Sequence, residues 1–139
     1  MTRNSLFAAG FAVAAIGFLG VSQAVSAGGA IEVAQADDPN IILMAELMVE
    51  GEDLYTHDCA SCHGHEGEGT NGPKFEESSY LSSVSGTVGM ILGGNTNHGM
   101  PEWATVYDNR EVAAVATYIR NSFGNEYGLI LEAWVANRR

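Results

Sequence analysis

The chain has little cysteine and little positive charge. Only two of its 139 residues are cysteine, and six are lysine or arginine against 17 aspartate or glutamate. Two cysteines cannot build a framework of several disulfides. The formal net charge of −11 argues against nucleic acid and against anionic membrane surfaces as partners.

A long hydrophobic run is also missing, apart from one segment near the start. Leu6–Val21 is apolar but has only sixteen residues, three of them glycine, and a spanning helix normally needs about 20. Because Arg3 precedes the run and small residues follow it, residues 1–36 are predicted to be a secretory signal and linker, with cleavage after Ala27 or Ala36. Retention as a membrane anchor is the alternative, and we expect membrane contact only in that case.

Residues 37–139 are enough for one small domain. Removing the signal takes away one acidic residue, Glu32, and one basic residue, Arg3, so the net charge stays at −11. Such a charge favours steering toward a basic patch on another protein, while a solvated face that only maintains solubility is the alternative.

The strongest motif is Cys59-Ala60-Ser61-Cys62-His63, because C-x-x-C-H is the attachment signature of a c-type haem. Two cysteines three positions apart lie about one helical turn from each other, so both thiols can face one edge of a porphyrin. His63 then follows onto the face of the ring as the proximal iron ligand. The sequence therefore predicts one haem c, covalently bound through Cys59 and Cys62.

Two other kinds of site use the C-x-x-C spacing, a thioredoxin-like dithiol and half of a zinc site. A zinc site needs two further ligands at suitable spacing. His57 and His65 crowd the same loop and do not form a second pair elsewhere. Export also favours haem, since covalent haem attachment in bacteria takes place outside the cytoplasmic membrane.

The hydrophobic pattern on both sides of the motif predicts helices joined by glycine-rich loops. Asp37–Asn40 resembles a linker or helix cap, and Ile41–His57 is predicted to be a helix leading to the haem motif. Gly64–Gly72 is predicted to be a loop. Ser78–Leu92 has room for one or two short helices, and Gly93–Gly99 is expected to be irregular.

A further helix is predicted to begin at Asp108, with Glu111 completing a capping box, and to close at Gly124. Apolar residues recur at helical spacing inside it. In the tail, Leu129, Ile130, Ala133 and Trp134 repeat at helical spacing too, and Arg138 and Arg139 follow. These patterns together predict an all-α domain.

The second axial position of the haem iron decides between two functions. If a side chain fills it, only electron transfer is possible, whereas an open position permits ligand binding or catalysis. Met100 follows a glycine-rich loop and precedes Pro101, which suits a loop held against the ring. His98 is a rival ligand on the same loop, although an exposed histidine is the simpler interpretation. Met90 is interpreted as a core residue.

On these motifs, residues 51–124 resemble a class I c-type cytochrome. Gly51 and Tyr55 are similar to the family's N-terminal helix, where a glycine lets the terminal helices cross closely. The resemblance implies a small cytochrome c fold of helices and loops around one haem. It also implies that the carbonyl of Pro73 accepts the other N–H of His63, and that Tyr118 packs near Gly51.

The distal part of the chain carries the rest of the resemblance. Gly99–Trp103 is similar to the family's distal loop, which makes Met100 the implied iron ligand and Trp103 a ring-packing residue. Glu111–Asn125 resembles the end of cytochrome domains that serve quinoprotein alcohol dehydrogenases and sulfite dehydrogenases. Lys74–Leu81 departs from the Pro-Leu sequence common in the family, so the packing at the haem edge is not predicted.

We therefore expect a periplasmic, single-haem electron carrier that is not itself an enzyme. It would take electrons from a periplasmic dehydrogenase, as a soluble carrier or a dedicated subunit, and pass them to another cytochrome or a terminal oxidase. His63 and Met100 would hold the iron. The alternative is an open-site haem protein for small-ligand sensing or peroxidase-like catalysis, with Met100 packed but unbound.

Overall fold

The computed structural model describes residues 38–139, and in this part of the chain helices are joined by loops and turns, with no strand. The predicted signal and linker, residues 1–36, lie outside the described residues. Within residues 38–139 no helix is both long enough and apolar enough to cross a membrane. The elements are α2 (Pro39–Leu54), a π-helical turn (Tyr55–Cys59), α3 (Ala60–His63), a 3-10 turn (Ser79–Ser82), α4 (Val84–Gly93), a 3-10 turn (Thr96–His98), α5 (Asn109–Asn121) and α6 (Glu132–Ala136).

Helix α2 begins two residues before the predicted start, because Asp38 caps it. The carboxylate of Asp38 accepts a hydrogen bond from the N–H of Asn40 at 2.8 Å. The predicted helix over Ile41–His57 is present, but its last three residues, 55–57, are π-helical and not α-helical. The α-helical pattern ends at Leu54 and widens into the π-helical turn that leads to the first cysteine of the motif.

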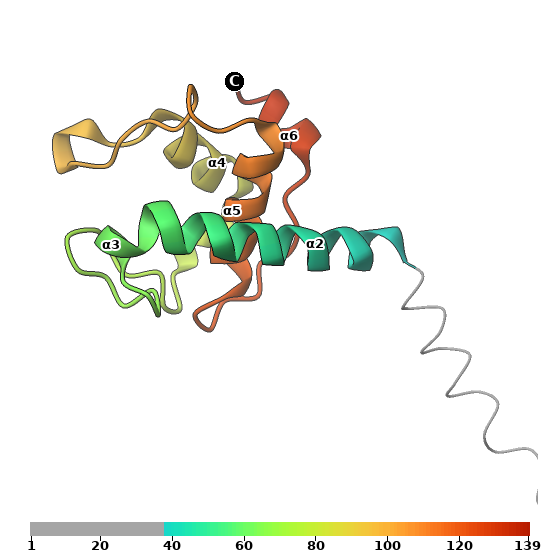
Figure 1. Cartoon of the computed structure of the whole chain (residues 1–139), viewed down its shortest axis with the longest axis horizontal. Helices are drawn as coiled ribbons and strands as arrows, with labels where there is room; N and C mark the ends of the chain where they lie inside the picture. Colours follow the sequence, from blue (N-terminus) through green and yellow to red (C-terminus); the bar gives the residue numbers. More distant parts are fainter. Residues whose placement is uncertain (1–37) are drawn as a thin grey trace, which may run out of the picture.

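Helices α2 and α5 cross (Figure 1), and Gly51 lies at the crossing. A methyl group added at Gly51 would collide with the carbonyl of Ala114 and lie 2.7 Å from the Cβ of Tyr118. The aromatic rings of Tyr55 and Tyr118 pack beside this point, with centroids 5.4 Å apart. The close helix crossing expected at Gly51 and Tyr118 is present.

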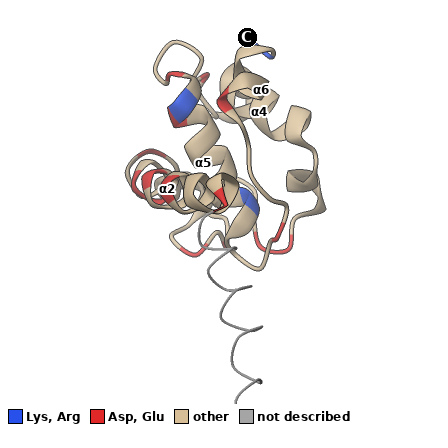
Figure 2. Ribbon diagram, turned by 90° about the vertical axis from the view of Figure 1, so that its right-hand side faces the viewer, with Lys and Arg blue, Asp and Glu red and all other residues tan. Residues whose placement is uncertain are grey.

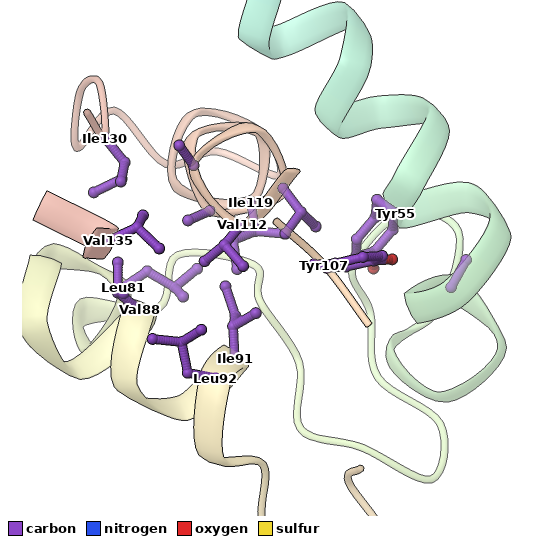
Figure 3. Close-up of a cluster of buried hydrophobic side chains, with 14 residues drawn as sticks. Tyr55, Leu81, Val88, Ile91, Leu92, Tyr107, Val112, Ile119, Ile130 and Val135 are labelled. Atoms are coloured by element: carbon purple, nitrogen blue, oxygen red, sulfur yellow. The ribbon is translucent and has the colours of Figure 1, made fainter. Parts of the chain in front are cut away.

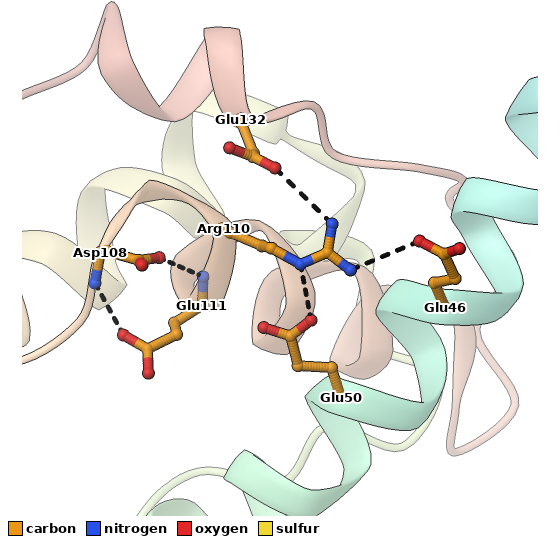
Figure 4. A network of polar contacts seen from close by, with 6 residues as sticks. All are labelled: Glu46, Glu50, Asp108, Arg110, Glu111 and Glu132. Carbon is orange, nitrogen blue, oxygen red and sulfur yellow. Dashed lines mark hydrogen bonds and ion pairs between the residues drawn. The ribbon is translucent and has the colours of Figure 1, made fainter.

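Helix α5 is the centre of the fold and has the predicted capping box. The N–H of Glu111 donates to Asp108 at 2.9 Å, and the carboxylate of Glu111 accepts from the N–H of Asp108 at 2.8 Å (Figure 4). Val112, Val115 and Ile119 are buried on its apolar face. They meet residues of the Ser79–Ser82 turn, α4 and the tail in one hydrophobic core (Figure 3), which includes Leu81, Val88, Ile91, Leu92, Ile130 and Val135.

The tail packs differently from the expectation. Helix α6 spans only five residues and begins at Glu132, so Leu129 and Ile130 precede it. Ile130 is fully buried, with its N–H donating to the hydroxyl of Thr117 at 3.0 Å, whereas Trp134 is 44% exposed. Of the tail residues at helical spacing, Trp134 therefore lies largely outside the core, and Val135 of α6 is fully buried.

Acidic residues outnumber basic ones along the described chain (Figure 2), and one arginine lies close to three of them. Arg110 of α5 lies 2.8 Å from Glu50 and 3.5 Å from Glu46, both on α2, and 3.8 Å from Glu132 of α6 (Figure 4). Because these groups are exposed, each pair stabilises the fold weakly. The cluster nevertheless joins three helices at one point.

Candidate functional site

A largely apolar cavity of about 610 Å³ opens beside α3. This volume lies within the range of roughly 300–1,000 Å³ that is usual for ligand and cofactor cavities. Its walls come from α3, the loop after it, α4, the loop before α5, and α5 itself. The residues of the C-x-x-C-H motif that were predicted to hold haem all line it, as do Pro73, Met100 and Trp103.

The motif is presented to the cavity by the π-helical turn and α3. Cys59 ends the π-helical turn and is half-buried, Cys62 is exposed, and His63 is buried. The Tyr55 hydroxyl donates to the carbonyl of Gly64 at 2.6 Å, which ties the start of the π-helical turn to the end of α3. Cys59, Cys62 and His63 are therefore held on one short, well-anchored segment.

The imidazole of His63 has a fixed orientation. Its Nδ1 lies 2.9 Å from the carbonyl oxygen of Pro73, and since a carbonyl only accepts, Nδ1 carries the proton and Nε2 keeps its lone pair. The ring stacks on Phe75, with centroids 4.2 Å apart and planes at 15°. A side chain at Gly72 would lie within 2.7 Å of the ring. The contact implied between His63 and Pro73 is present.

The Cys59 thiol is unlike the nucleophile of a redox dithiol. Burial, together with the nearby charge of Asp58, raises the pKa of the Cys59 thiol to about 12. Reactive dithiols have a lowered pKa, because the thiolate is the nucleophile. A thioether carries no charge and is compatible with the buried position of Cys59.

The zinc alternative also lacks support in the described part of the chain. Over residues 38–139 no group of three or more histidine, cysteine, aspartate or glutamate side chains is placed to hold a metal ion.

The distal loop presents Met100 through a small backbone bridge. The N–H of Asn95 donates to the carbonyl of Met100 at 2.9 Å, and the N–H of Met100 donates back to Asn95 at 3.1 Å. Gly99, with φ of +82°, makes the left-handed turn that this bridge requires. Met100 is half-buried and lines the cavity.

Two other candidate ligands also lie at the cavity. His98 is exposed, and its Nδ1 lies 2.9 Å from the side-chain oxygen of Asn95. Met90, which was interpreted as a core residue, is a half-buried wall residue of the same cavity. A methionine in an apolar helix is equally typical of a hydrophobic core and of a cavity wall, so the sequence does not distinguish these two environments.

Trp103 is anchored on the distal side. Its indole stacks on the ring of Tyr107, with centroids 4.7 Å apart and planes at 22°. The backbone N–H of Trp103 donates to the carbonyl of Ile91 at 3.2 Å, and the backbone N–H of Ala104 donates to the carbonyl of Leu92 at 3.2 Å. The loop that carries Met100 and Trp103 is thereby attached to the end of α4.

Several wall residues of the cavity were not predicted from the sequence. The segment where the chain departs from the family pattern supplies Lys74, Phe75, Ser78, Tyr80 and Leu81, which form the part of the wall that could not be predicted. The other missed residues that line the cavity are Asp58, Asn71, Thr87, Ile91, Asn95, Tyr107, Val115 and Ile119. Most of them are ordinary apolar or small polar residues whose types carry no haem-specific signal.

The residues present fit a covalently bound haem. Two thiols at the required spacing border an apolar cavity, and the adjacent imidazole is oriented by a carbonyl, as metal-bound histidines usually are. A thioether-bearing side chain lines the same cavity.

Comparison with known proteins agrees with this fit. The family model described as cytochrome c oxidase, cbb3-type, subunit III matches residues 46–119, which is more than half of the chain. A relative, cytochrome c-551 of Bacillus subtilis (strain 168), is 33% identical over 70 residues, covering 50% of this chain and 59% of that protein. The chain thus spans about three-fifths of the length of this curated relative.

Proposed function

This chain belongs to the c-type cytochrome family and carries covalent haem c, and we propose that it is an exported, single-haem electron carrier. It would accept electrons one at a time from a periplasmic dehydrogenase and deliver them to another cytochrome or a terminal oxidase. One observation carries the proposal: an oriented imidazole, His63, and a thioether, Met100, line the same cavity beside the two attachment cysteines.

Haem c, when bound, supplies one iron that changes its charge by a single electron. The protein's part is to hold the ligands and to shield the ring. The carbonyl of Pro73, 2.9 Å from Nδ1, fixes the orientation of His63 and raises its basicity. Met100 as the distal ligand leaves no open coordination position, and a methionine ligand raises the reduction potential.

The two cysteines differ in exposure, which suggests a route for the electron. Cys62 is exposed, whereas Cys59 is half-buried and His63 is buried. The thioether edge at Cys62 is therefore the point where a partner can approach most closely. The rest of the cavity is enclosed mainly by apolar side chains, which also favours a high potential.

The periplasmic location and the dehydrogenase partner rest on the sequence. The signal-like residues 1–36 support export, and the resemblance of Glu111–Asn125 to dehydrogenase-associated cytochrome domains supports the donor. The net charge of −11 favours partners with a basic docking patch, and such encounters are faster at low ionic strength.

One observation favours a second candidate, an open-site haem protein for ligand sensing or peroxidase-like catalysis. His98 lines the cavity two residues from Met100, where a side chain is able to act on a bound small molecule. In this case Met100 is packed but not bound to iron.

The test compares absorption spectra of the exported holoprotein with those of Met100→Ala, Met90→Ala and His98→Ala. If Met100 is the ligand, the weak long-wavelength sulfur-to-iron band of the oxidised protein disappears in Met100→Ala alone. Met90→Ala is a matched control, because Met90 is a second methionine at the same cavity. A high-spin wild type that binds carbon monoxide readily would refute the carrier proposal and favour the open site.

A further inference from the structure

Tyr107 contacts three separate parts of the molecule around the cavity. Its ring stacks on Trp103, its hydroxyl donates to Asp58 at 2.6 Å, and its carbonyl accepts a hydrogen bond from the Arg139 guanidinium at 2.6 Å. The side chain belongs to the buried cluster drawn in Figure 3, and it also lines the cavity. No feature of the predicted function uses this arrangement.

Asp58 belongs to the wall that carries the attachment cysteines. It lies in the π-helical turn, directly before Cys59, and π-helical turns are frequent at functional sites. One carboxylate oxygen accepts from Tyr107, and the other lies 2.8 Å from Nδ1 of the exposed His57. The bond between Asp58 and Tyr107 therefore joins the cysteine wall to the distal wall, across 49 residues of sequence.

This hydrogen bond is charge-assisted. Asp58 is the one carboxylate among the described residues that line the cavity. The bond from Tyr107 is the main cause that lowers the pKa of Asp58, while burial and the same bond raise the pKa of Tyr107. At neutral pH a neutral phenol thus donates to an ionised carboxylate, which is one of the stronger kinds of hydrogen bond in proteins.

The backbone of the segment 100–107, which carries Tyr107, is held by the C-terminal tail. The guanidinium of Arg139 donates to the side chain of Asn109 at 2.6 Å and to the carbonyls of Ala104 and Tyr107. On its other side the segment is attached to α4 by two backbone hydrogen bonds, from Trp103 and Ala104, each 3.2 Å long, and by packing against the core. Tyr107 therefore lies at the point where the part of the segment held by Arg139 meets the cavity.

We propose that Tyr107 is a positioning residue that closes the cavity by locking the segment 100–107 to Asp58, and so keeps Met100 in place on the distal side. The inference rests on the proposed function, because it takes Met100 as the iron ligand. Tyr107 acts on Met100 through the loop and is not itself an iron ligand. Opening of the loop is then the step that must precede displacement of Met100 by any external ligand.

The test uses the oxidised holoprotein and its Tyr107→Phe, Asp58→Ala and doubly substituted variants, with imidazole as the external ligand. Each single substitution should raise the rate of imidazole binding about tenfold, which corresponds to about 1.4 kcal/mol. The double variant should match either single variant, because both remove the same bond. Tyr118→Phe is the matched control, since it removes a hydroxyl from a tyrosine outside the cavity lining.

A second measurement tests the bond between Tyr107 and Asp58, which we call the lock, even if Met100 is not the iron ligand. Hydrogen exchange at the amides of Trp103 and Ala104 reports opening of the loop directly, and it should accelerate in Tyr107→Phe but not in Tyr118→Phe. If the wild type lacks the sulfur-to-iron band, the function proposed for Met100 fails, while the exchange rates still decide on the lock. Unchanged binding and exchange rates, or additive effects in the double variant, would overturn the inference.

Discussion

Replacing Gly51 with alanine tests how tightly the two longest helices of the described chain pack. The added methyl group meets the backbone carbonyl of Ala114 and the Cβ of Tyr118, neither of which moves by a simple side-chain rotation. Overpacking of this kind costs about 1–3 kcal/mol, and the upper end applies because the obstacle is backbone. Alanine regains about 1 kcal/mol of helix propensity, so the net loss of stability should be about 2 kcal/mol.

Thermal unfolding of the holoprotein, followed by circular dichroism, measures this loss. For a domain of this size, about 2 kcal/mol lowers the melting temperature by about 8–16 °C. Gly93→Ala is the matched control: Gly93 is also helical, and a methyl group there meets nothing within 4 Å. If Gly51→Ala melts at or above the temperature of Gly93→Ala, the helices do not cross as closely as the structure shows.

Three shorter predictions concern the cap, the tail and the acid limit of stability. Asp108→Ala should lose about 1 kcal/mol in urea unfolding, because the capping box of α5 is removed, and Asp108→Asn should lose less. Ile130→Ala should cost about 2–5 kcal/mol in the same assay and Trp134→Ala only a fraction of that, since Ile130 is fully buried and Trp134 is 44% exposed. The bond from Tyr107 holds the pKa of Asp58 below its ordinary value of 3.8, so the stability that Asp58 contributes is present above that value and is lost as the pH falls through the lowered pKa. Asp58→Asn should therefore flatten the decline of unfolding free energy below about pH 4, and an unchanged acid decline would contradict this assignment.

The parts of the site that are contiguous in sequence were predictable. The spacing of Cys59, Cys62 and His63 is itself the chemical requirement for haem attachment, so a short motif was sufficient. The capping box at Asp108 and Glu111 was equally local, because both hydrogen bonds span three residues. Local chemistry of this kind does not depend on how the rest of the chain packs.

The parts that were not predictable depend on packing over long distances. The π-helical turn after Leu54 adds a residue to one turn, and no propensity marks it in the sequence. The inward direction of Val135 depends on where α6 starts. The lock between Asp58 and Tyr107 joins residues 49 positions apart, and a tyrosine before a helix cap has no special meaning until its partner is known.

The helix crossing and the lock are physically linked. Asp58 lies seven residues after Gly51, about two helical turns further along the same continuous helical segment, while Tyr107 lies just before the start of α5. The crossing of α2 and α5 at Gly51 therefore sets where Asp58 arrives relative to Tyr107. If the methyl group in Gly51→Ala separates the helices, it should also weaken the lock and speed imidazole binding in the variant, beyond any effect seen in Gly93→Ala. Destabilisation without faster binding would show instead that the position of Asp58 is set by the π-helical turn alone.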